Sequence, residues 1–111
     1  VSQIGYRRAF QLSIESERID AARCVELGLA NKLFPDDSLR EDTIEWAKAI
    51  AERAPLSLAA SKKTMRHATS GSWASTFDLE APLQKALRQS EDCAEGVAAF
   101  FGKRKAEFKG R

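Results

Sequence analysis

Hydrophobic and polar positions repeat along most of the chain with the period of an α-helix. Tyr6, Phe10 and Ile14 recur every four residues and mark one apolar face of a helix from about Tyr6 to Glu15. Similar stripes run through most of the remaining sequence, whereas the alternation typical of strands is nearly absent. The pattern therefore predicts a mainly α fold.

Residues that favour helix ends divide this pattern into short elements. Asp20 and Ser90 are predicted N-caps, because their side-chain oxygens can accept a backbone N–H of the next turn. The helix that Asp20 opens is expected over Ala21 to Leu27. Gly28 can take the left-handed conformation that a helix end often needs, so the helix should stop there.

Two more helices are predicted in the middle of the chain. Ser38 and Glu41 have the spacing of a capping box, which favours a helix start. This helix should stop before Pro55, which suits the first turn of the next helix because its missing N–H would have no partner there. That second helix is expected to end near Ser70-Gly71.

A proline lies inside the next helical pattern. Leucines at steps of four mark a long stretch that begins at Ser72 or Ser75, and Pro82 falls within it. An interior proline removes a backbone hydrogen bond and clashes with the preceding turn, at a cost of about 3 kcal/mol. We therefore expect a kink or a break near Leu79 to Pro82.

One segment has the character of a strand. Leu29 to Phe34 is mostly apolar, and Pro35 with two aspartates closes it. The predicted fold class is accordingly mainly α with at most one short strand, arranged as a single helical domain over residues 1–111.

Composition and charge narrow the class further. Hydrophobic residues are 43% and charged residues 31% of the chain, and the net charge is +2. No apolar run reaches membrane-spanning length and no secretory signal is visible. Cys24 and Cys93 match no zinc or redox spacing, which favours reduced cysteines in a cytoplasmic protein.

The C-terminal end is basic. Residues Lys103 to Arg111 include five basic residues and one acid, Glu107. Such a tail could meet a phosphate, but without a motif we interpret it as a solvated end. Nucleic-acid binding is the weakest alternative for the chain, because the tail is its only support.

Residues that could perform catalysis are not arranged for it. His67 is a lone histidine with no metal-ligand spacing around it, and Glu15 and Glu17 lie near a helix end. No Gly-x-Ser-x-Gly elbow or glycine-rich phosphate loop is present. The sequence therefore predicts no catalytic residue, no metal and no cofactor.

Large aromatic side chains are numerous for so short a chain. They either form the core of one helical domain or serve an interface with another domain or subunit, and we favour the interface. The residues concerned are Trp46, Trp73, Phe77, Phe100, Phe101 and Phe108.

Three segments, in order and at the right spacing, resemble the enoyl-CoA hydratase/isomerase (crotonase) family. RIDAARCVELGLANKLFP at residues 18–35 is similar to the family's R-I-x-A-x-x-A-x-x-x-G-L-V-N-x-V-x-P, with Cys24 where alanine is usual. SEDCAEGVAAFFGKRKAEF at residues 90–108 is similar to its closing S-x-D-x-x-E-G-x-x-A-F-x-x-K-R-x-x-x-F. APLSLAASKK at residues 54–63 is similar to a helix start between them.

The resemblance implies a C-terminal helical, trimer-forming part of a crotonase-family subunit, with the N-terminal spiral core absent. In that family the oxyanion hole and the catalytic glutamates lie in the N-terminal region, so no catalytic residue carries over to this chain. Phe100 matches an aromatic position near the adenine of coenzyme A, and Lys103 matches a lysine near its phosphate. Gln84 lies near a position where some members have an aromatic residue.

The implied function is the C-terminal portion of an enzyme acting on acyl-CoA thioesters, providing oligomerisation and part of the coenzyme A site. The substrate carries the coenzyme A, so no separate cofactor is expected. The expected partners are an acyl-CoA substrate in the full-length protein and further copies of the chain, as a trimer or dimer of trimers, with no nucleic acid and no membrane. The alternative is a non-catalytic helical interaction domain that oligomerises.

Overall fold

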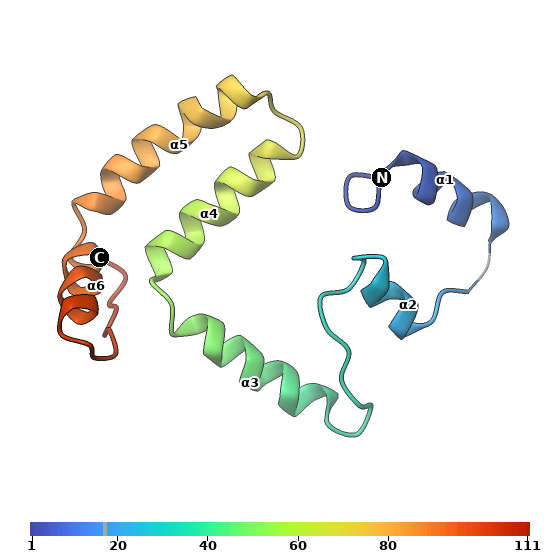
Figure 1. Ribbon diagram of the computed structural model, residues 1–111, viewed down its shortest axis with the longest axis horizontal. Coiled ribbons are helices and arrows are strands. Elements are labelled where there is room, and N and C mark those ends of the chain that lie inside the picture. Colours follow the sequence, from blue (N-terminus) through green and yellow to red (C-terminus); the bar gives the residue numbers. More distant parts are fainter. Residues whose placement is uncertain (17) are drawn as a thin grey trace. The chain divides into compact units, whose positions relative to one another are not determined.

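The computed structural model describes residues 1–16 and 18–111, and every regular element in these residues is a helix (Figure 1). The predicted mainly α fold is therefore confirmed. In this part of the chain no helix is both long and apolar enough to cross a membrane. The helices are α1 (Tyr6–Glu15), α2 (Ala21–Glu26), α3 (Leu39–Ala51), α4 (Pro55–Ala68), α5 (Trp73–Arg88) and α6 (Glu91–Phe101).

The chain divides into two compact units. The first runs from Val1 to Ile44 and the second from Glu45 to Arg111, so the boundary falls within α3. The expectation of one domain over residues 1–111 stays a prediction.

The first unit contains α1, which has the predicted bounds, and α2, which begins at Ala21 as predicted and ends at Glu26, one residue before the predicted end. Asp20 caps α2 by accepting the N–H of Arg23 on Oδ1 at 2.7 Å. Gly28 follows α2 with φ of 74°, the left-handed conformation that glycine adopts without strain. Leu27, at the end of α2, is the buried apolar residue of this unit.

The strand expected at Leu29 to Phe34 does not form, and that prediction is wrong. The first two of these residues instead complete the end of α2, because the N–H groups of Leu29 and Ala30 both donate to the Cys24 carbonyl, at 2.8 and 3.1 Å. A strand needs a neighbouring strand to take up its remaining backbone groups. No segment among residues 1–16 and 18–111 provides one.

In the second unit α4 and α5 form a helical hairpin (Figure 1). Pro55 is the first residue of α4, as expected. Ser72 is the N-cap of α5, because its hydroxyl accepts the N–H of Ser75 at 3.1 Å. His67, near the end of α4, places Nε2 at 3.0 Å from Ser75 Oγ and so links the two helices where they meet.

Of the kink or break expected near Leu79 to Pro82, the break is absent and the kink stays a prediction. α5 runs without interruption from Trp73 to Arg88, with Pro82 inside it (Figure 1). The missing N–H of Pro82 leaves the helix one hydrogen bond short, but α5 also contacts both α4 and α6. Contacts with neighbouring helices offset the local cost that the sequence pattern alone emphasises.

Candidate functional site

The last helix, α6, positions the residues that the sequence singled out. Ser90 caps it by accepting the N–H of Cys93 at 3.1 Å, as predicted. Glu91 and Asp92 occupy its first turn, where negative charge favours the helix dipole. Ala99, 3% exposed, anchors the far end of the helix in the unit. The C-terminal end of α6 is thereby held in a defined place.

The chain leaves α6 through a Schellman turn. Arg104 N donates to the Ala99 carbonyl at 3.1 Å and Lys103 N to the Phe100 carbonyl at 3.3 Å. Gly102 keeps an ordinary φ of −75°, whereas Lys103 takes the left-handed conformation with φ of 49°. Glycine is the usual residue at that point of the turn, and a side chain there costs roughly 1–2 kcal/mol. A lysine at position 103 therefore costs free energy that a glycine would not.

Phe100, in the last turn of α6, and Lys103, in the turn that follows it, are the two predicted binding residues. Phe100 is 78% exposed and its ring stands edge-on to that of Phe101, with centroids 5.6 Å apart. Lys103 is exposed as well. An open aromatic face beside a cation can stack on a planar base and pair with a phosphate.

The residues after the turn are fastened to α6, so the interpretation of the tail as a solvated end is wrong. We call residues 103–111 the C-terminal strap. The carboxylate of Asp92, only 4% exposed, accepts the N–H of Lys109 at 2.6 Å and of Gly110 at 2.9 Å. Asp92 N in turn donates to the Arg111 carbonyl at 3.0 Å. A single buried carboxylate therefore binds the far end of the strap.

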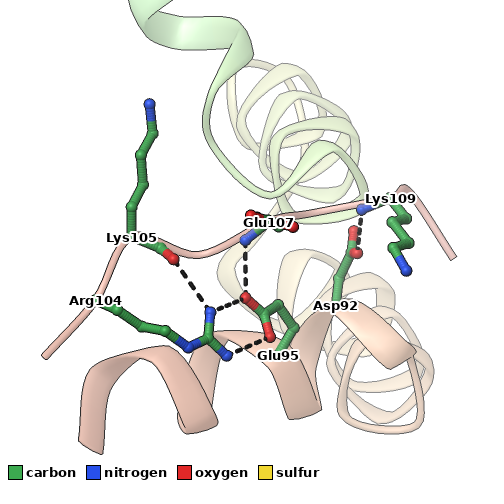
Figure 2. A network of polar contacts seen from close by, with 6 residues as sticks. All are labelled: Asp92, Glu95, Arg104, Lys105, Glu107 and Lys109. Atoms are coloured by element: carbon green, nitrogen blue, oxygen red, sulfur yellow. Dashed lines mark hydrogen bonds and ion pairs between the residues drawn. The ribbon is translucent and has the colours of Figure 1, made fainter. Parts of the chain in front are cut away.

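Glu95 binds the near end of the strap, as Figure 2 shows. Its carboxylate accepts hydrogen bonds from Nη1 and Nη2 of Arg104, at 2.6 and 2.8 Å, and from the N–H of Glu107 at 2.8 Å (Figure 2). The hydrogen bonds from Arg104, followed by that from Glu107, lower the pKa of Glu95 from 4.5 to about 2. The same contact raises the pKa of Arg104. Glu95 is therefore held in its charged form.

Packing and charge attach the strap at further points. The ring of Phe108 lies over Gly96, where the Cβ of an alanine would meet it at 3.5 Å. Lys105 Nζ lies 2.8 Å from Glu52 Oε1, just after α3, and its hydrogen bond lowers the pKa of Glu52. The neighbour of Gly96 on α6 is therefore the strap.

The remaining residues that the sequence analysis considered do not gather into a site. Glu15 accepts a hydrogen bond from Gln11 on the same exposed helix, and Glu17 lies outside the described residues. Gln84 reaches Glu80 one turn earlier on α5, at 3.5 Å. In residues 1–16 and 18–111 both cysteines are free and no group of side chains could hold a metal ion.

Sequence reasoning missed the acidic residues that hold the strap. A helix start and the helix dipole explain acidic residues such as Asp92 and Glu95 only from their neighbours in sequence. The two residues also lie three positions apart and therefore on one face of α6. A basic segment following an acidic helix face was the available signal. The partners of Asp92 are backbone N–H groups seventeen and eighteen residues away, which no local pattern identifies.

Fold and site together define an all-helical segment in which the last helix presents an aromatic and the fastened strap after it presents a cation. A family model described as enoyl-CoA hydratase/isomerase matches residues 1–111, so the chain belongs to the enoyl-CoA hydratase/isomerase family. The chain is 31% identical to the 2,3-dehydroadipyl-CoA hydratase of Escherichia coli (strain K12) over all its 111 residues, which are 44% of that protein.

Two further comparisons agree. A probable enoyl-CoA hydratase of Rhodobacter capsulatus is 34% identical over 98% of the chain and 42% of its own length. The solved structure of an enoyl-CoA hydratase from Geobacillus kaustophilus HTA426 superposes with a TM-score of 0.90 at 34% identity, over 98% of this chain and 41% of that one. The chain thus spans less than half the length of these relatives.

Proposed function

We propose that this chain is the C-terminal portion of an enoyl-CoA hydratase/isomerase-family enzyme that acts on acyl-CoA thioesters. In this proposal it provides subunit assembly and part of the coenzyme A site. Phe100 stacks on the adenine and Lys103 pairs with a phosphate. The double-bond chemistry belongs to the remainder of the enzyme, because the family resemblance assigns no catalytic glutamate to this chain.

The observation that carries the binding proposal is the conformation of Lys103. It occupies the left-handed position of the turn after α6, with φ of 49°, although Gly102 is the adjacent residue. Backbone strain that persists where glycine would remove it marks positions whose side chain has a use. Phe100, 78% exposed on the preceding turn, supplies the apolar face that a nucleotide base needs.

Exposed apolar faces support the assembly proposal. In the first unit Tyr6 and Phe10 stack with centroids 5.8 Å apart while 68% and 52% exposed. In the second unit Trp73 and Phe77 also stack at 5.8 Å, and they are 83% and 59% exposed. Burial of aromatic pairs of this size is energetically favourable, and exposed pairs mark surfaces that contact another protein.

The binding proposal is tested by Lys103→Ala in the full-length enzyme. Alanine keeps the Cβ and hence nearly the same backbone cost, so the change removes mainly the ammonium group. We expect KM for an acyl-CoA to rise about three- to tenfold while kcat stays within about twofold, because uniform binding is lost. Lys62→Ala, an exposed lysine on α4, is the matched control and should leave both constants unchanged. An unaltered KM for Lys103→Ala would refute the binding role.

The second candidate is a non-catalytic helical interaction domain, and the exposed aromatic pairs favour it equally. It predicts a stable oligomer that has no measurable affinity for coenzyme A. Sedimentation together with a calorimetric titration of coenzyme A separates the two candidates. Oligomers that bind coenzyme A support the first candidate, and oligomers that do not bind it support the second.

A further inference from the structure

We propose that Glu95 is a positioning residue for the candidate coenzyme A site, acting through Arg104 to hold the turn that carries Lys103. The inference rests on the proposed function and extends it to a residue of α6 that is outside the predicted binding pair. Glu95 is not expected to touch the ligand. Its effect is on the backbone conformation from which Lys103 projects.

Arg104 is fixed both through its backbone and through its guanidinium. Its backbone N–H closes the Schellman turn on the Ala99 carbonyl at 3.1 Å. Its guanidinium forms two parallel bonds with Glu95, at 2.6 and 2.8 Å (Figure 2). Two-point contacts of this kind fix direction as well as distance. The residue directly after Lys103 therefore has little freedom.

The turn that contains Lys103 needs the support that Arg104 gives. A lysine in the left-handed region costs free energy that glycine would not. Once Arg104 is released, we expect turns in which Lys103 returns to negative φ to become more accessible. The Glu95 carboxylate opposes them twice, through Arg104 and through the N–H of Glu107 at 2.8 Å. Lys105 O, which accepts from Arg104 Nη1 at 3.1 Å, adds a third restraint on the same stretch.

The local role of Glu95 is separate from the attachment of the whole strap. The far end of the strap has its own ties, because Asp92 accepts two N–H groups there and Arg111 pairs with Glu91 at 3.0 Å. Loss of the Glu95 contacts should therefore loosen residues 103–107 and leave the far end in place. Glu91→Gln provides the matched control, because it breaks an ion pair between the same helix and the same strap far from Lys103.

The experiment is a double-mutant cycle on KM for an acyl-CoA in the full-length enzyme. We expect Glu95→Gln to raise KM about three- to tenfold with kcat unchanged, and Glu91→Gln to change neither. In the Lys103→Ala background Glu95→Gln should raise KM no further, because there is no longer an ammonium to position. A purely structural role would instead give the same fold-change in both backgrounds, and that result would overturn the proposal.

Arg104→Lys tests the link from its other side. Lysine keeps the charge but cannot form two parallel bonds, so KM should rise in the same direction as for Glu95→Gln. This variant also decides the case if Glu95→Gln does not fold. If Lys103→Ala leaves KM unchanged, the proposed function fails. If Lys103→Ala raises KM while Glu95→Gln and Arg104→Lys do not, only the positioning role fails.

Discussion

Different kinds of hydrogen bond stabilise the N-terminal unit and the C-terminal end of the molecule. In the described part of residues 1–44, side-chain hydrogen bonds such as the Asp20 cap of α2 join residues three or four positions apart. In α6 and the strap, side chains join residues 9 to 20 positions apart, from Glu95–Arg104 to Glu91–Arg111. These hydrogen bonds are local in the first region, whereas in the second they join segments that are distant in sequence.

The difference shows which part of the chain brings distant segments together. Local caps secure individual helices in the first unit but bring no distant segments together. At the C-terminal end two carboxylates, Asp92 and Glu95, fold nine residues of strap back on one helix. Lys103 begins that strap and Phe100 lies on α6 just before it, so the more constrained region is also the one that presents the candidate binding residues.

The largest expected effect separates a long-range carboxylate from a local one. Asp92→Ala removes the acceptor of the Lys109 and Gly110 N–H groups from a buried position, and we expect a loss of about 3 kcal/mol in unfolding free energy. Asp20→Ala removes a solvent-exposed cap and should cost about 1 kcal/mol. Urea denaturation of both variants measures the two values. Equal losses would mean that the strap adds nothing beyond an ordinary cap.

A smaller effect is expected where the strap packs on α6. A methyl group at Gly96 would lie 3.5 Å from the Phe108 ring, an ordinary contact, so Gly96→Ala should be neutral or gain up to about 1 kcal/mol from helix propensity. Gly96→Leu should displace the ring and lose about 2 kcal/mol. Thermal unfolding of the two variants provides the test, and an Ala variant as unstable as the Leu variant would contradict this packing.

The smallest effect is expected from pH, because the Glu95–Arg104 pair is partly open to solvent and therefore screened. Binding to Arg104 lowers the pKa of Glu95 to about 2 in the folded state, from 4.5. Its stabilising contribution is therefore complete above about pH 4.5 and is lost as the pH falls through about 2. Unfolding free energies measured across this window should fall more steeply for the unsubstituted chain than for Glu95→Gln. Parallel curves would exclude this contribution.

Local signals in the sequence predicted most of the helices and their ends. Asp20, Gly28 and Ser90 lie where expected, because a cap depends only on neighbours within one turn. The strand predicted at Leu29 to Phe34 is wrong because strand pairing needs a second segment. A break near Pro82 is absent because neighbouring helices support α5.

The candidate site was predictable only in part. The family resemblance singled out Phe100 and Lys103, and both lie at the exposed turn after α6. The left-handed backbone of Lys103 and its link to Glu95 could not be predicted, because they follow from a strap whose partners are distant in sequence. Their roles in binding coenzyme A stay predictions.

The proline inside α5 has a consequence for the order in which the molecule folds. A peptide with Pro82 at its centre is a poor isolated helix, since helix growth cannot pass a missing hydrogen bond without gain elsewhere. α5 should therefore become ordered only when it docks against α4, with the His67–Ser75 contact joining the two at their turn. We expect α4 to be protected from hydrogen exchange earlier than α5 during refolding, so that the hairpin grows from its first helix to its second.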